Sequence, residues 1–134
     1  MKAQAGVVEF LVLTLLMLFL AQGSLQLAGE ARKNGLLLLQ RSVVDRTLNR
    51  MEFIIHELNL TGAGRQKVEI RTLPFISYSL KKQKNEIILT AISDWSNYSS
   101  SISVPPLNFS CHPSTQSNLT ITLQAWDSGI EVIC

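Results

Sequence analysis

The chain has 134 residues, of which 46% are hydrophobic and only 16% are charged, whereas an average soluble domain has about 25% charged residues. This length suffices for one domain with a modest core and excludes a large multidomain enzyme. The net charge of +2 is an average over unlike regions, because residues 1–29 carry two charged side chains, residues 30–57 carry nine, and no lysine or arginine follows Lys84. A nucleic-acid partner is not expected, since its binding would need a concentrated basic face.

The N-terminal part of the chain is strongly apolar. Residues 10–29 contain no charged side chain, and residues 10–21 are almost wholly apolar. A helix that spans a bilayer needs about 20 mostly apolar residues, a length that this segment reaches only with the glycine-containing residues 23–29. The segment therefore predicts a membrane helix whose apolar length only just reaches that needed to span a bilayer.

A helical pattern continues beyond the apolar segment. Apolar side chains recur on one side at Leu37, Val44, Leu48, Met51, Ile55 and Leu58, which is typical of an amphipathic helix. No proline precedes Pro74, so we expect one helix over residues 5–58, about 80 Å long at 1.5 Å per residue. The glycine-containing turn 59–64 should end it.

After Gly64 the hydrophobic period changes to two, which predicts a β-rich head of four to six short antiparallel strands. The expected strands cover residues 68–73, 75–80, 86–92, 99–104, 119–126 and 130–134, with a hairpin tip at 81–85 and a turn at 127–129. The predicted fold class is α+β: a long N-terminal helix, hydrophobic in its first half and amphipathic in its second, packed on a small antiparallel β-sheet head. Trp126 is expected in the core, and Trp95 is the candidate for an exposed aromatic residue.

The sequence Lys2-Ala3-Gln4-Ala5 opens the chain after Met1, and Glu9 and Phe10 stand directly before the apolar helix. A carboxylate at the centre of a bilayer costs about 2.5–3.5 kcal/mol, and less near the interface. Glu9 therefore needs a partner, and the candidate is a free α-amine created by cleavage just upstream, on this chain or on a neighbour.

These residues resemble the processing site of archaeal type IV pilins with a class III signal peptide, in which a prepilin peptidase removes a short basic leader at the cytoplasmic face. The resemblance implies a processing site formed by Lys2, Ala3, Gln4 and Ala5, with the cut near Ala3–Ala5. It also implies a role for Glu9 and Phe10 in assembly. It has two departures, since Ala3 stands where glycine is usual and the spacing from Gln4 to Glu9 is one residue longer. The implied regions are a leader (1–4), a membrane and filament-core helix (5–29), its amphipathic continuation (30–60) and a β-rich head (65–134).

The resemblance implies a structural subunit of a type IV pilus-like extracellular filament, with a role in adhesion or surface interaction. The precursor would be inserted in the membrane, and mature copies would then assemble with one another through their N-terminal helices. Alternatives are a minor pilin or pseudopilin of a secretion or uptake machine, a secreted domain released after Gly23, and a membrane-tethered β-domain binding protein. Two basic residues, Arg32 and Lys33, follow the apolar segment, whereas only Lys2 precedes it. The positive-inside rule alone would therefore place the head in the cytoplasm.

Four triplets fit the N-glycosylation pattern, at Asn59, Asn97, Asn108 and Asn118, where chance would give roughly one. Taken together they favour an extracytoplasmic head, although a composition rich in serine and threonine generates such triplets as well. We treat all four asparagines as candidate glycosylation sites.

Cys111 and Cys134 are the only cysteines. A metal site would need further ligands in a suitable spacing, so a disulfide is favoured over two free thiols. It would close a 24-residue loop and contribute around 3 kcal/mol to stability, and this loop resembles the C-terminal disulfide loop of type IV pilin heads. His56 and His112 are the only histidines, and no nucleophile motif or phosphate-binding loop occurs. We therefore expect no enzymatic activity, no metal and no cofactor.

Overall fold

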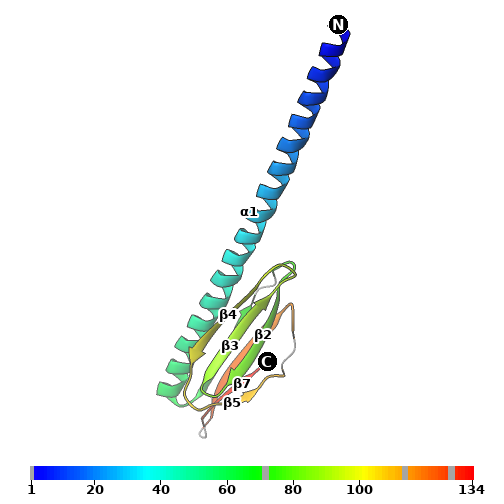
Figure 1. The fold of residues 1–134 in the computed structure, drawn as a ribbon. Coiled ribbons are helices and arrows are strands. Elements are labelled where there is room, and N and C mark those ends of the chain that lie inside the picture. Colours follow the sequence, from blue (N-terminus) through cyan, green and yellow to red (C-terminus); the bar gives the residue numbers. More distant parts are fainter. Residues whose placement is uncertain (1, 71–72, 113–114, 127–128) are drawn as a thin grey trace. The chain divides into compact units, whose positions relative to one another are not determined.

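The computed structural model describes residues 10–70, 73–112, 115–126 and 129–134, together with the helical backbone of residues 2–9. The chain divides into two compact units, Met1–Gly35 and Leu36–Cys134. The elements in chain order are α1 (Lys2–Thr61), β1 (Gly64–Ile70), β2 (Ser77–Gln83), β3 (Glu86–Ile92), β4 (Asn97–Ser103), β5 (Asn108–Ser110), β6 (Leu119–Trp126) and β7 (Gly129–Ile133) (Figure 1).

The predicted long helix is confirmed, and α1 runs without interruption from Lys2 to Thr61. It ends where Gly62 adopts a φ of 69° and donates its amide to the carbonyl of Leu58 at 2.9 Å. A glycine in this left-handed conformation is the usual helix stop, because it carries no Cβ. Two residues later, Gly64 has a φ of 147°, which residues with a side chain rarely adopt, and a Cβ there would also lie 2.9 Å from Leu58 Cδ2, so glycine suits the turn into β1.

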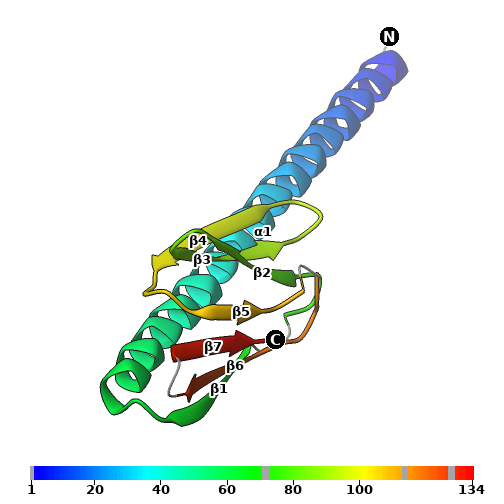
Figure 2. The same cartoon turned by 90° about the horizontal axis from the view of Figure 1, so that it is seen from below.

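The strands of the second unit form two sheets (Figure 2). One has the order β1-β6-β7-β5 and the other the order β2-β3-β4. All pairings are antiparallel, as expected, except that β5 runs parallel to β7. The three-residue strand β5 was not predicted, because a segment of this length is too short to show an alternating pattern.

Strand bounds differ from the sequence-based expectations at β1, which begins at Gly64 instead of residue 68, and at β2 and its hairpin, where a strand over residues 75–80 was expected. Strand β2 begins at Ser77 and continues through Gln83, so the tip between β2 and β3 is only Lys84 and Asn85 instead of residues 81–85. Lys84 takes a positive φ of 54° at this tip. Parts of two other predicted elements, residues 71–72 and 127–128, lie outside the described residues.

The core of the second unit lies between one side of α1 and the inner faces of both sheets. The buried hydrophobic residues of α1, which include most of the predicted stripe, are Val44, Leu48, Met51, Ile54, Ile55 and Leu58. Leu37 was expected to belong to it but is 41% exposed. Seven residues are slightly less than two helical turns, so the buried side continues from Val44 to the fully buried Gln40 and the half-buried Leu36.

The expectation for Trp126 is also wrong, since this side chain is 54% exposed. Along β6, the side chains of Leu119, Ile121, Leu123 and Ala125 point into the core. Successive side chains of a strand point to opposite faces of the sheet. The side chain of Trp126, the residue after Ala125, therefore points outward from the core despite its large apolar ring.

The predicted disulfide between Cys111 and Cys134 is present, with an S–S distance of 2.04 Å and a Cα–Cα distance of 4.9 Å. The parallel pairing of β5 and β7 explains why these two cysteines meet. Its last pair is Ser110 with Ile133, and one further step along both strands brings Cys111 beside Cys134. The covalent bond thus holds the shortest strand against the C-terminal one.

We expect the double substitution Cys111→Ser/Cys134→Ser to lower the free energy of unfolding by about 3 kcal/mol, the value for closing a loop of this length. The measurement is urea unfolding of the full chain in detergent, followed by tryptophan fluorescence. A reducing agent should destabilise the wild type by a similar amount and leave the double variant unchanged. Equal stability of oxidised and reduced wild type would contradict this account.

Tyr78 is the one described side chain whose buried polar atom has no hydrogen-bond partner. The residue is completely buried, and its backbone exchanges two hydrogen bonds with Gln116, at 2.7 and 3.0 Å. Burial raises the pKa of its phenol, because the ionised form would lose its hydration. The hydroxyl therefore makes no hydrogen bond in the core, and its burial disfavours the ionised form of the phenol.

Because the pKa of Tyr78 is higher in the folded state than in the unfolded state, its neutral form favours folding up to a pH of about 10, and this contribution is lost as the pH rises further. Tyr78→Phe should abolish that part of the alkaline loss of stability and should be as stable as the wild type at neutral pH. Denaturant unfolding of both proteins between pH 8 and 11 measures the difference. An unchanged slope in Tyr78→Phe would refute the assignment.

Candidate functional site

The most unusual surface of the described chain is the apolar side-chain cover of α1 between residues 10 and 27. Its large hydrophobic side chains are all exposed, from 55% for Val12 to 78% for Phe19. Soluble monomers rarely leave apolar patches of more than a few hundred Å² open to water. Among the described residues, one helix is long and apolar enough to cross a membrane, and this is α1, whose most apolar window is not buried at all.

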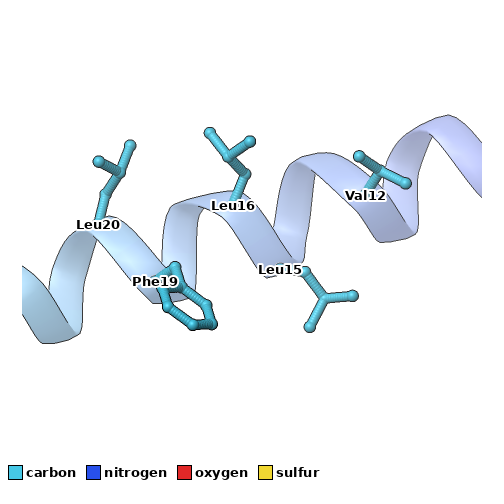
Figure 3. Close-up of a pocket in the computed structure, with 5 residues that line it drawn as sticks. All are labelled: Val12, Leu15, Leu16, Phe19 and Leu20. Atoms are coloured by element: carbon cyan, nitrogen blue, oxygen red, sulfur yellow. The ribbon is translucent and has the colours of Figure 1, made fainter.

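The side chains of this segment form rows along the helix (Figure 3). Val12, Leu16 and Leu20 project in one row, and Leu15 and Phe19 project in another. Together they line an apolar hollow. Residues three and four apart are neighbours on a helix, and the grooves between such rows are the places where side chains of another helix or lipid chains fit.

The two hydroxyl groups of the apolar segment are satisfied within α1 itself. Thr14 Oγ1 donates to the carbonyl of Phe10 at 2.7 Å, and Ser24 Oγ donates to the carbonyl of Ala21 at 2.9 Å. In hydrocarbon an unpaired polar group costs several kcal/mol. These two side chains can therefore enter an apolar environment without that penalty.

The residues of the predicted processing site lie outside the described side chains. Lys2, Ala3, Gln4, Ala5 and Glu9 belong to the helical backbone of α1, and nothing further is defined for them. Phe10 is described and exposed. The pairing of Glu9 with an N-terminal amine remains a prediction.

All four predicted glycosylation sites lie on the surface of the second unit. Asn59 is in the last turn of α1, Asn97 and Asn108 are the first residues of β4 and β5, and Asn118 directly precedes β6. Each of the four side chains is exposed, so each could accept a glycan. The modification itself remains a prediction.

Sequence reasoning missed a polar clamp between α1 and the loop that joins β3 to β4. Gln40 is completely buried, donates from Nε2 to the carbonyl of Ser96 at 3.1 Å and accepts from Ser96 Oγ at 2.7 Å. Within the loop, Ser93 Oγ donates to the same carbonyl at 2.8 Å and accepts from the Ser96 amide at 3.1 Å. A glutamine within an otherwise apolar stripe is the only sequence signal for this clamp.

Next to the clamp lies an exposed aromatic pair that was also not predicted as a pair. The rings of Phe75 and Trp95 have centroids 6.4 Å apart and are tilted by 49°, within the range of favourable aromatic contacts. Phe75 is 69% and Trp95 is 46% exposed, so the sequence-based suspicion that Trp95 is open to solvent is confirmed. Phe75 also has a φ of 67°, a backbone conformation that is unusual for a bulky residue.

Within the described part of the chain, no three histidine, cysteine, aspartate or glutamate side chains come together in a group that could hold a metal ion. Comparisons with protein-family models, with curated proteins and with solved structures found no match. Because their apolar side chains are exposed, the apolar segment of α1 and the aromatic pair of Phe75 and Trp95 are the candidate functional surfaces.

Proposed function

We propose that this chain is a pilin-like structural subunit, anchored in the membrane by the apolar segment of α1 and then assembled with other copies into an extracellular filament. The observation that carries the proposal is the exposure of that segment around its whole circumference. Exposed apolar residues occupy consecutive positions 10–13 and 15–20, so they face every direction around the helix.

A helix that is hydrophobic on all sides is a buried helix or a membrane span. A groove on one soluble partner would cover one side of such a helix and leave the other sides in water. Lipid covers all sides before assembly, and several neighbouring helices do so in a filament core. In both environments the segment is removed from water, which is the main driving force available to it.

The second unit supports the proposal that the head and the apolar segment have separate roles. It has a core of its own, made by residues from Val44 to Val132, and a disulfide, whereas the apolar segment contributes no residue to that core. Disulfides persist in oxidising compartments outside the cytoplasm. This unit therefore suits an extracytoplasmic head that needs no support from the membrane segment.

The N-terminus of the mature protein tests the proposal directly. We expect mass spectrometry of the membrane or filament fraction to find a start at Gln4 or Ala5, as left by a prepilin peptidase. A start at Ser24 would identify a secreted domain and would remove Glu9, and an intact Met1 would identify a tethered membrane protein. Either of these results would end the pilin proposal.

In the proposed assembly, Glu9 pairs with an N-terminal amine and fixes the axial register of neighbouring helices. Glu9→Gln should therefore strongly reduce filament yield, measured by electron microscopy of sheared surface filaments, while membrane insertion and head folding stay intact. Glu30→Gln, a change on the same helix beyond the apolar segment, is the matched control and should assemble normally. Normal filaments from Glu9→Gln would exclude the register role.

A further inference from the structure

The exposed aromatic pair lies at one end of the three-stranded sheet, where two loops meet. Strand pairing joins Ser77 to Ile92 and Ile92 to Asn97. The segment before β2, which carries Phe75, and the loop between β3 and β4, which carries Trp95, are therefore at the same end of β2, β3 and β4, which lie side by side (Figure 1). The two rings come together because the sheet brings their loops together.

Both loops are held in place. The loop of Trp95 is tied to the buried Gln40 through Ser96, as described above. Phe75 is kept at a positive φ, a conformation that costs a bulky residue of order 1–3 kcal/mol and that is maintained only where the surrounding structure imposes it. Strain that presents an apolar ring to solvent does not serve core packing, and such strain is typical of binding sites.

The first residue after this loop is a candidate glycosylation site. Asn97 begins β4, and the burial pattern of that strand leaves Asn97 and Ser99 exposed while Tyr98 between them is half-buried. Side chains two apart lie on the same face of a strand, so the asparagine and the serine of this triplet share the solvent-facing side of the sheet. Trp95 stands two residues before Asn97 in the sequence.

The other three triplets lack this neighbourhood. The residues two positions before Asn59, Asn108 and Asn118 are glutamate, proline and glutamine. Asn59 lies in a helix, and the hydroxyl of its Thr61 donates to the carbonyl of Glu57 at 3.0 Å. Among the four triplet asparagines, Asn97 is thus the one that follows an exposed aromatic residue by two positions in the sequence.

We infer that Asn97 carries an N-linked glycan whose first sugar packs on the rings of Trp95 and Phe75. One face of a sugar ring presents C–H bonds, which are attracted to the negative face of an aromatic ring. The glycan would cover apolar surface that is now in water and would fix the loop between β3 and β4. The inference rests on the proposed function, because N-glycans are added outside the cytoplasm.

The chemistry requires a sugar donor linked to a lipid phosphate and a transferase that acts on the exposed chain. The amide nitrogen of Asn97 forms a bond to the anomeric carbon of the sugar, and the bond from that carbon to the phosphate oxygen breaks. The lipid phosphate leaves with the electron pair, and the amide nitrogen loses one proton. No oxidant or reductant is needed.

The test uses the full-length protein made in a host with N-glycosylation. Peptide mass spectrometry should find Asn97 occupied, and Ser99→Thr, which keeps the triplet, should preserve occupancy. Asn97→Gln should lower the Tm of the head, a unit of about 100 residues, by about 4 °C or more. In a Trp95→Ala background the same change should have no effect, whereas in a Trp126→Ala background, with a different exposed tryptophan removed, it should have its full effect.

Phe75→Gly provides a second background in case Trp95→Ala does not fold, because glycine accepts the positive φ, and it should reduce the effect of Asn97→Gln as well. An unmodified Asn97, or an equal loss of Tm in all backgrounds, would overturn the inference. Protease accessibility of the head on intact cells separates this result from a failure of the proposed function. An accessible head with an unmodified Asn97 refutes only the glycan, and an inaccessible head refutes the proposed location.

Discussion

The buried side of α1 from Leu36 to Leu58 is the surface on which the second unit depends. The two sheets are separate hydrogen-bonded assemblies, and among the described residues one isolated bridge, between Tyr78 and Gln116, links a strand of one sheet to the segment that leads into the other. What the sheets share is a hydrophobic core with the same side of the helix. The free energy gained by removing apolar area from water, about 25 cal/mol per Å², is thus the main contribution that holds the two sheets and the helix together. Polar contacts such as Gln40 with Ser96, and Tyr98 with Asp45 at 3.0 Å, then fix how β4 and its loop sit on the helix.

Sequence periodicity predicted the elements whose pattern is long. The helix, β3 and β6 extend over enough residues for a period of 3.6 or 2 to be recognised, and their positions agree with the expectation. The parallel strand β5 has three residues and gains its place from a partner more than 20 residues away in sequence. Trp126 was misplaced because its hydrophobicity was weighed above its parity in the strand. Leu37 was misplaced because a seven-residue repeat drifts on a straight helix.

The candidate surfaces also fall into those that a local sequence pattern reveals and those that depend on contacts between distant residues. The apolar segment and the glycosylation triplets are local patterns, so the sequence alone could identify them. The pair of Phe75 and Trp95 joins residues 20 positions apart, and the clamp joins Gln40 and Ser96, which are 56 positions apart. Contacts of this kind depend on strand register and on the helix side that is buried, and neither follows from residue type alone.

The uniform apolar cover of α1 also explains why a polar residue near its start would matter. A helix that is apolar on all sides gains nearly the same free energy at many rotations and axial positions among similar helices. Such packing is strong but poorly specified, and a single polar residue in an apolar interface is a documented means of fixing register at some cost in stability. Among residues 1–29, the charged side chains are Lys2 and Glu9. In the proposed filament Lys2 is removed with the leader, so Glu9 is the charge left to set the position of each subunit.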